Sequence, residues 1–394
     1  MFRVWAIVGL VLLFYSCKQQ KLATHTTVDE TSVLQDTTYI EPTYHITSAG
    51  DTLDVLGTEV DIEISRIIKD TLTFIGVGDI MMGTNFPSES YLPSNGGFDL
   101  WTEVSDTLGQ ADVTFGNLEG VILNEGGEQK KCRNPKVCYL FRSPESYVQH
   151  LVDAGFDVVS LANNHAGDFG ETGRKNTMST LDSLGIKYAG LLAAPTTTFM
   201  KDGMYFGLAA FAPNVGTVSI HDEERAVRLV RELDSLVDVV IVSFHAGAEG
   251  SNHQHVTRKT ETFYGENRGN VYDFSRKMID AGGDVIFGHG PHVTRAIDIY
   301  NDRFIAYSLG NFCTYGRFNL RGVNGVAPIL KIQTNSEGKF LAGQVISIVQ
   351  LGSGGPRIDA KKRVIKIIKD LTQKDFPESQ LSIDGSGIIS YIQN

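Results

Sequence analysis

Short apolar runs alternate with stretches of helical periodicity from about residue 71 onward. The apolar runs predict strands over residues 72–77, 113–115, 158–161, 187–190, 204–211, 239–244, 285–287, 296–300, 304–308, 327–333 and 343–351. Apolar residues at helical spacing predict helices over residues 146–154, 173–184, 222–236, 270–281 and about 358–372, the last followed by loop. Because strands and helices alternate, the chain is predicted to have an α/β fold with βαβ crossovers. The later strands follow one another directly, so we expect mixed sheets.

The N-terminus has the pattern of an export signal. Arg3 precedes an apolar run over residues 4–14, which ends at Ser16 and Cys17. The run is too short to span a bilayer as a helix and is typical of a signal-peptide core. A small residue before a cysteine at this point resembles a lipoprotein signal, in which Cys17 is lipidated and begins the mature chain. The alternative is a plain secretory signal or membrane anchor with an incidental cysteine, and export follows on either interpretation.

Four segments are expected along the chain. Residues 1–17 are predicted to be the lipoprotein-type signal, and residues 18–70 a polar tether with a possible edge element. Residues 71–355 form the predicted main domain, and residues 356–394 a C-terminal helix and tail. We therefore expect an exported protein that is lipid-anchored at the bacterial cell envelope, at the outer membrane or in the periplasm.

Composition and cysteine spacing limit the possible partners and the redox environment. The formal net charge of the 394 residues is −11, which argues against a nucleic-acid partner because phosphate binding needs clustered Lys and Arg. Cys132 and Cys138 enclose a turn-prone loop that can close as a disulfide in an oxidising compartment. Cys313 remains as an expected buried thiol.

Polar side chains capable of binding a metal follow most of the predicted strands. They are Asp79, Asn117, Glu119, Asn163, Asn164, His165, His245, Glu249, His289, His292 and Asn311. Ligands of an α/β sheet bind at the carboxyl ends of its strands, so we expect these side chains at one rim. Each has an ordinary explanation as a cap or a structural histidine. Together, imidazole, carboxylate and amide groups are the ligand mixture that zinc, manganese and iron accept.

Five of these regions also resemble a known family. They are Gly-Asp-Ile-Met-Met-Gly at 78–83, Asn-Leu-Glu-Gly at 117–120, Ala-Asn-Asn-His at 162–165, Gly-His-Gly-Pro-His at 288–292 and Ser-Leu-Gly-Asn-Phe at 308–312. In this order they resemble the signature of the CapA family of bacterial capsule and poly-γ-glutamate synthesis proteins, over about residues 71–335. That family is related to the calcineurin-like metallophosphoesterases. The resemblance implies a multi-layer α/β sandwich with mixed sheets, flanking helices and a metal site at the strand ends.

The resemblance implies roles for individual residues. It assigns Asp79 as the first aspartate ligand, Asn117 or Glu119 in the region of the bridging carboxylate, Asn164 and His165 as the Asn–His pair, and His245, His289 and His292 as the histidine ligands. It implies one or two divalent ions, of manganese, zinc or iron. Met81 stands where the phosphoesterases have a further histidine. Because a thioether is a poor ligand for these ions, one of the two sites is expected to be weakened or lost.

The expected activity is metal-dependent hydrolysis of a phosphoester or a γ-glutamyl amide, with His165 protonating the leaving group. The expected partners are an anionic polymer or phosphoester substrate, the membrane through the lipid anchor, and capsule-synthesis machinery. The competing hypothesis is a non-catalytic binding or assembly factor with a degraded metal centre, which Met81 favours and the retained histidines oppose. Arg142, Lys175 and Arg295 are candidates for holding an anion, although ordinary surface charge is the simpler interpretation.

Overall fold

The computed structural model describes residues 69–132 and 138–392. The predicted signal, the lipidation site Cys17, the tether and its possible edge element lie outside the described residues. Within the described ranges, no helix is long and apolar enough to cross a membrane.

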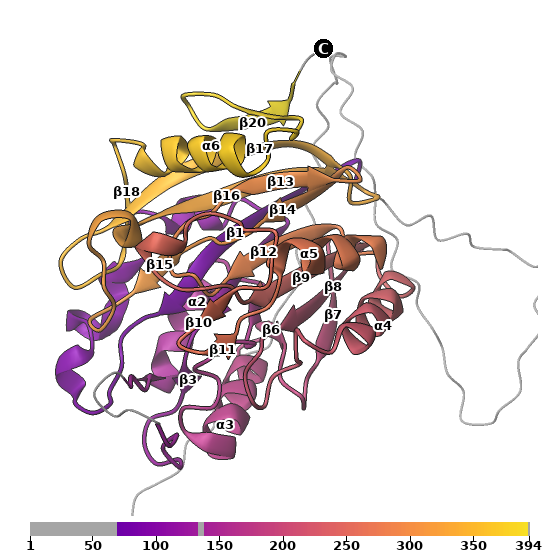
Figure 1. Ribbon diagram of the computed structural model, residues 1–394. Helices are drawn as coiled ribbons and strands as arrows, with labels where there is room; N and C mark the ends of the chain where they lie inside the picture. The colour runs from indigo at the N-terminus through magenta and orange to yellow at the C-terminus, as the bar shows by residue number, and fades with distance from the viewer. Residues whose placement is uncertain (1–68, 133–137, 393–394) are drawn as a thin grey trace, which may run out of the picture. The chain divides into compact units, whose positions relative to one another are not determined.

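The larger of two main β-sheets, here called the main sheet, has ten strands and mixed strand directions (Figure 1). Its central path consists of β19 (Leu381–Ile383), β20 (Ile388–Tyr391), β17 (Phe340–Gln350), β16 (Val326–Asn335), β1 (Thr71–Met81), β2 (Val113–Leu118), β5 (Val158–Ser160) and β6 (Lys187–Ala189). Two short strands join it at the side, β15 (Asn311–Thr314) beside β1 and β18 (Pro356–Ile358) beside β17. β1 runs parallel to β2 and β15 but antiparallel to β16. The metal-binding candidates on β1, β2 and β5 therefore reach the same edge.

The second sheet has six strands, with parallel pairs at its centre. Its order is β13 (Ile297–Tyr300), β14 (Arg303–Ala306), β12 (Val285–His289), β9 (Val239–His245), β8 (Met204–Phe211) and β7 (Thr196–Lys201). β14, β12, β9 and β8 are parallel, and β13 and β7 close the edges as antiparallel hairpins. Two small ribbons, β3 (Val121–Ile122) with β4 (Arg142–Ser143) and β10 (Thr262–Phe263) with β11 (Glu266–Asn267), lie in the connecting loops.

Aromatic side chains join the two sheets face to face. Phe115 of β2 stacks on Phe287 of β12, with ring centroids 5.3 Å apart, and Phe74 of β1 meets Phe206 of β8 at 5.9 Å. Gly76 of β1 permits this contact, because a Cβ at that position would lie 2.4 Å from Cε1 of Phe287. These residues belong to a large buried apolar cluster, to which α6, β19 and β20 also contribute, and its burial provides much of the driving force for folding.

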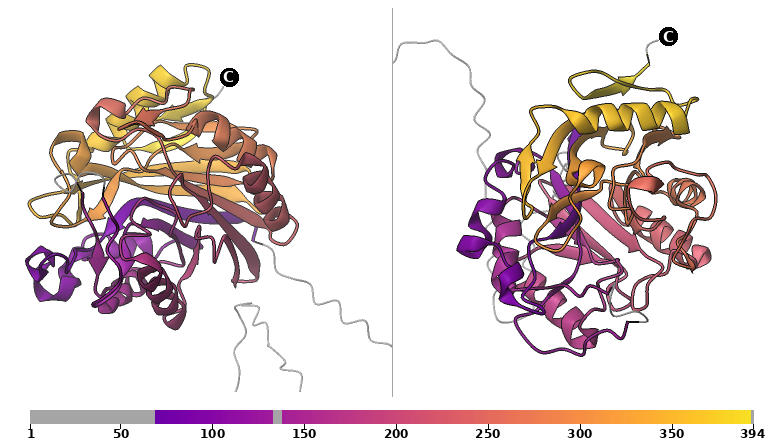
Figure 2. Two further views of the ribbon diagram at one scale, coloured as in Figure 1. Left: turned by 60° about the horizontal axis from the view of Figure 1, so that its bottom comes forward. Right: turned by 60° about the vertical axis from the view of Figure 1, so that its left-hand side comes forward.

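Helices cover the outer faces of the two sheets (Figures 1 and 2). α1 (Ser105–Leu108), α2 (Val148–Asp153) and α3 (Gly170–Ser183) bury apolar residues against the main sheet, whereas α4 (Glu223–Asp234) and α5 (Val271–Asp280) cover the second. Asp222 and Asn270 cap α4 and α5 by accepting hydrogen bonds from backbone amides of the first turn. In contrast, α6 (Arg363–Asp375) packs on β16 and β17 from the inner side, because its apolar residues belong to the cluster between the sheets. The predicted α/β class, with mixed sheets and flanking helices, is confirmed.

The structure differs from the sequence prediction mainly in short elements. The segment after residue 355 was predicted as a helix and loop, but it also forms β18, β19 and β20, and α6 begins at Arg363. β7 and β15 were not predicted. Both are short strands at the side of a sheet, and β7 is only partly buried, so neither has a strong local pattern. The connecting loops add the short helices η1 (Glu89–Tyr91), η2 (Ser94–Leu100), η4 (Glu145–Tyr147), η5 (Ser251–His253) and η6 (Gly322–Gly325).

Candidate metal centre

The candidate ligands lie where strands of both sheets end. In the main sheet, Asp79 of β1 is the register partner of Asn117 in β2 and of Asn311 in β15. In the second sheet, His289 at the end of β12 is the register partner of His245 at the end of β9. The ligands therefore come from two facing sheets, and not from the rim of one sheet as the sequence suggested.

The carboxylate of Asp79 is fully buried among polar partners. Its Oδ1 accepts a hydrogen bond from Nδ2 of Asn117 at 2.8 Å, and its Oδ2 lies 2.9 Å from Nδ1 of His292. Nδ1 of His289 approaches Oδ1 to 3.3 Å. Burial raises the pKa of Asp79, but its interactions with His289 and His292 outweigh burial, and the net pKa lies far below the ordinary value. Asp79 is therefore held as a carboxylate, the form that binds a cation.

Three imidazole nitrogens surround one carboxylate oxygen of Glu119. From Oε1, Nε2 of His292 is 3.5 Å away, Nε2 of His245 is 3.8 Å away and Nε2 of His165 is 3.9 Å away. Oε1 is buried and has no hydrogen-bond partner among the described residues. Burial raises the pKa of Glu119 well above its ordinary value. Donor atoms of Glu119, His245 and His292 all lie within 4.8 Å of one another, which is a spacing that suits ligands of one metal ion.

Unpaired buried nitrogens are the second sign of a metal site. Both ring nitrogens of His245 and both of His289 are buried and have no hydrogen-bond partner among the described residues. One of these four nitrogens, Nδ1 of His289, has the 3.3 Å contact with Asp79, and the other three have none as short. Leaving a buried polar atom without a hydrogen bond costs about 1–3 kcal/mol, so the cluster requires an explanation. Burial lowers the pKa of His245 well below its ordinary value, so its imidazole is neutral and can donate a lone pair. The donor set of imidazole, carboxylate and amide fits a borderline divalent ion such as zinc, manganese or iron.

The loop that carries His292 is held in an unusual backbone conformation. His292 has a φ of 56° and Gly290 a φ of 111°, both in the left-handed region. A Cβ on Gly290 would lie 2.8 Å from the backbone nitrogen of Ala246, so glycine is needed there. Asn311 donates from Nδ2 to the carbonyl oxygen of His292 at 3.1 Å. With this loop conformation, His289 and His292 both reach the carboxylate of Asp79. Burial lowers the pKa of His292, but the carboxylates of Glu119 and Asp79 outweigh it and raise this pKa to about 10.

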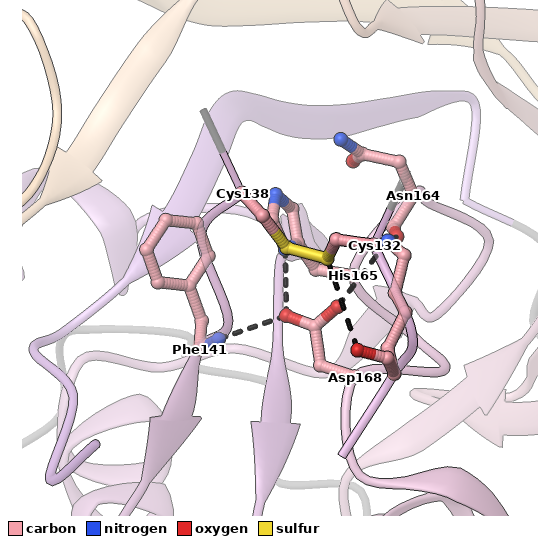
Figure 3. The surroundings of a disulfide bond; sticks show 7 residues. Cys132, Cys138, Phe141, Asn164, His165 and Asp168 are labelled. Carbon is pink, nitrogen blue, oxygen red and sulfur yellow. Dashed lines mark hydrogen bonds and ion pairs between the residues drawn. A yellow bond between two sulfur atoms is a disulfide. The ribbon is translucent and has the colours of Figure 1, made fainter. Parts of the chain in front are cut away.

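His165 forms a dyad with Asp168 beside the cluster (Figure 3). Nδ1 of His165 lies 2.7 Å from Oδ2 of Asp168, and the same oxygen accepts the backbone N–H of Phe141 at 2.8 Å. Its other nitrogen, Nε2, faces Glu119. Asp168 is fully buried, yet the sequence pattern did not single it out. The available signal was its position three residues after His165, in the turn that precedes α3.

The two neighbouring asparagines have different surroundings. Asn163 donates from Nδ2 to Oδ1 of Asn117 at 3.2 Å and to the carbonyl of Leu118 at 2.9 Å, so Asn163 orients Asn117 toward Asp79. Asn164 lines the cavity above the cluster, and its buried Oδ1 has no hydrogen-bond partner among the described residues. Asn164 is therefore the one whose oxygen remains available to an ion or a substrate.

Met81 and the predicted anion-binding residues lie elsewhere. Met81 is buried at the end of β1, opposite Thr314 of β15. Arg295 is fully buried and pairs with Glu261 at 2.7 Å, so it is neither surface charge nor part of the cavity. Arg142 donates to Oδ1 of Asn85 at 2.6 Å, and Lys175 is 72% exposed on α3. None of these three basic residues lines the cavity above the cluster.

A cavity of about 820 Å³ lies above His165 and His292. Its lining includes aromatic side chains, charged side chains of both signs, and a disulfide that joins Cys132 to Cys138 with the two Cα atoms 6.1 Å apart (Figure 3). Cys313 is a free, buried thiol on β15. The cavity is large enough for a substrate of several residues or sugar units and leads directly to the His165–Asp168 dyad.

Residues 73–315, which contain the ligand cluster, match the family model described as "Bacterial capsule synthesis protein PGA_cap". The chain belongs to this family. The capsule biosynthesis protein CapA of Bacillus anthracis is 28% identical over 276 residues, which cover 65% of this chain and 62% of that protein. The PGA biosynthesis protein CapA of Bacillus subtilis (strain 168) is 30% identical over 266 residues, covering 64% of this chain and 65% of that protein. The matches thus span less than two thirds of each relative.

Solved structures resemble the chain less closely. A hypothetical protein from Thermus thermophilus has a TM-score of 0.43 and 13% identity, covering 70% of this chain and 98% of that one. A purple acid phosphatase from yellow lupin (Lupinus luteus) seeds has a TM-score of 0.36 and 9% identity, covering 75% of this chain and 55% of that one. The PGA_cap membership thus rests on sequence, and the family resemblance predicted from the motifs is confirmed.

Proposed function

We propose that this PGA_cap protein is a metal-dependent hydrolase of capsule or polyglutamate metabolism, exported and lipid-anchored through Cys17 at the cell envelope. The observation that carries the hydrolase proposal is the group of imidazole nitrogens around the unpaired Oε1 of Glu119, with the His165–Asp168 dyad beside it. The signal-like N-terminus supports the location. The family supports the metabolic context.

The chain's own residues divide the work between binding and proton transfer. Asp79, Glu119, His245, His289 and His292 would hold the ion, and Asn117 orients Asp79 through its amide. A bound divalent ion polarises the scissile phosphoryl or carbonyl group and lowers the pKa of water. The loop at residues 289–292 keeps two of these imidazoles against one carboxylate.

His165 is placed to act as the general acid. Asp168 accepts a hydrogen bond from Nδ1, which leaves Nε2 directed toward Glu119 and the cavity. Protonated at Nε2, the ring can give that proton to the leaving oxygen or nitrogen of the substrate. The carboxylate of Asp168 fixes the orientation of the ring, as in other histidine–carboxylate pairs.

A second candidate function is a non-catalytic binding or assembly factor for an anionic capsule polymer. Met81 favours it, because a buried thioether occupies the position of a ligand histidine in the related phosphoesterases. Within residues 69–132 and 138–392, one group of carboxylate and imidazole donors has metal-binding spacing, which is consistent with one ion in place of two. Both candidate functions use the same cluster of residues. A measurement of substrate turnover distinguishes them, because only the hydrolase releases product.

Hydrolysis of two chromogenic probes tests the proposal. The metal-loaded protein is incubated with bis-p-nitrophenyl phosphate and with γ-glutamyl-p-nitroanilide, beside the variants Asp79→Ala and His289→Ala. The hydrolase proposal expects release of nitrophenol or nitroaniline by the wild type and its loss in both variants, with unchanged circular dichroism. Release that is equal in wild type and variants would refute catalysis at this cluster, and no release of either product would favour the binding factor.

A further inference from the structure

The cavity above the cluster carries charges of both signs, and they come from different sheets. Lys130, Lys131 and Arg317 lie in loops that follow β3 and β15 and are connected to the main sheet. Glu249 and Glu266 lie after β9 and in β11, in the connections of the second sheet. A substrate in this cavity therefore meets the lysine and arginine side chains of one half of the sandwich and the glutamates of the other.

Two of the three positive groups have no carboxylate partner among the described residues. The guanidinium of Arg317 lies 4.9 Å from the ring centroids of both Tyr91 and Tyr139, which fix its position without neutralising its charge. Arg317 donates from Nη1 to the carbonyl of Phe86 at 3.5 Å, but neither Arg317 nor Lys131 forms an ion pair within residues 69–132 and 138–392. Lys130 donates to the carbonyl of Asn164 at 2.7 Å and lies 3.4 Å from the carboxylate of Asp168. Two cations thus remain uncompensated.

The negative groups share a single cation. Arg268 is 3% exposed and contacts Glu249 through Nη2 and Glu266 through Nη1, the latter at 3.4 Å. Two carboxylates against one guanidinium leave a net charge of about −1 on these three groups, and His292, which also lines the cavity, is paired with Asp79 and Glu119. Arg268 also donates to the carbonyl of Gly247, which fixes it behind the carboxylates. Arg268 therefore holds Glu249 in place, whereas Glu266 is 66% exposed, and the two carboxylates, here called the acidic wall, repel a ligand that carries only negative charge.

We propose that the cavity recognises a zwitterionic unit, such as an amino acid or peptide end with a free ammonium group beside its carboxylates. The carboxylates of this ligand meet Arg317 and Lys131, and its ammonium group meets Glu249 and Glu266. The exposed ring of Tyr264, also in the lining, provides a further face for the ammonium group. This inference rests on the proposed function and narrows its substrate class from phosphoesters and amides to amine-terminated peptides with acidic side chains.

Binding of two matched dipeptides tests this inference without requiring turnover. The probes are γ-glutamylglutamate, which has an ammonium group, and its N-acetyl derivative, which lacks one, titrated calorimetrically into the full chain. The variants are Arg317→Gln and Glu249→Gln, with Glu266→Gln as a second variant on the acidic wall. Arg228→Gln and Glu232→Gln, a pair at 3.8 Å exposed on α4, are the matched controls. Metal content is measured for every sample.

Each charge should affect one end of the ligand. Arg317→Gln should weaken both dipeptides about tenfold, because it removes one charge-assisted contact to carboxylate. Glu249→Gln or Glu266→Gln should weaken the free dipeptide several-fold and leave the N-acetyl form unchanged or tighter, so that the preference for the ammonium group falls. The α4 controls should bind both probes as the wild type does.

The inference is overturned if the wild type binds both dipeptides equally, binds neither at millimolar concentration, or keeps its preference in both acidic-wall variants. A protein that shows the expected binding pattern but no hydrolysis would retain this inference and lose the hydrolase proposal. Hydrolysis of the phosphate diester without any dipeptide binding would retain the hydrolase proposal and overturn this inference.

Discussion

The His165–Asp168 dyad gives the sharpest test of how this site works. Asp168→Asn keeps the size of the side chain but removes its charge. The present carboxylate accepts from His165 at 2.7 Å and from the backbone of Phe141 at 2.8 Å, and it lies 3.4 Å from Nζ of Lys130. An amide cannot accept all of these bonds, and it can turn its NH₂ group toward Nδ1, which would put the wrong nitrogen of His165 in the protonated state.

Two quantities follow from this geometry. Loss of one charge-assisted hydrogen bond in a fully buried site should lower the free energy of unfolding by about 1.5–3 kcal/mol. Loss of the correct tautomer should lower kcat by about 10²- to 10⁴-fold with little change in KM, because the proton is transferred after binding. The first quantity is measured by urea denaturation and the second by steady-state hydrolysis of the probe that the wild type cleaves.

A matched control shows whether the effect comes from losing the carboxylate of the dyad or from losing any carboxylate. Asp182 accepts a hydrogen bond from the hydroxyl of Tyr188 at 2.8 Å on the exposed face of α3, so Asp182→Asn removes a carboxylate with an aromatic partner far from the cluster. It should leave kcat within about twofold of the wild type. If Asp168→Asn also keeps the wild-type kcat while remaining folded, His165 is not the general acid and the assignment of the dyad is wrong.

Three further predictions concern packing, pH and export. Gly76→Val should lower the free energy of unfolding by about 1–3 kcal/mol or prevent folding, because its Cβ would clash with Phe287 between the sheets; a thermal midpoint equal to that of the wild type would contradict this packing. Asp359 is partly desolvated, which raises its pKa, but its bonds with Arg363 outweigh this and lower the pKa to about 2. The contribution of the Asp359 carboxylate to the free energy of unfolding should be complete above about pH 4 and should be lost as the pH falls through about 2. At about pH 2 the wild type and Asp359→Asn should therefore have the same free energy of unfolding. Cys17→Ser should abolish incorporation of labelled fatty acid in cells, and retained label would rule out this anchor.

The sequence pattern predicted local structure better than it predicted pairing. Apolar runs located the central strands because burial on both faces leaves continuous hydrophobic segments, as in β9 and β12. Periodicity and caps located α4 and α5 within a few residues. Which strand lies beside which depends on contacts between distant residues, so the division into two facing sheets did not follow from the pattern.

In the candidate site too, residues with a local sequence signal were predicted, and those that depend on long-range contacts were not. Asp79, His245 and His289 were identified because each follows an apolar run that predicts a strand, and the structure brings them together. Asp168 was missed because its role depends on the approach of Phe141 and His165, and the position of Arg295 was misjudged because its partner Glu261 is remote in sequence. Most arginine side chains in proteins are exposed. The burial of Arg295 is explained only by its pairing with Glu261, which the sequence pattern does not reveal.

The metal content of the purified protein tests the central claim most directly. Elemental analysis after supply of manganese, zinc and iron should find one or two equivalents of a divalent ion in the wild type and in His221→Ala, whose histidine is exposed and bonded to the carbonyl of Asn267. The double variant His245→Ala/His289→Ala, which removes four buried nitrogens that have no hydrogen bond among the described residues, should bind none. Equal metal content in all three proteins, or a wild type that takes up no metal, would contradict the account.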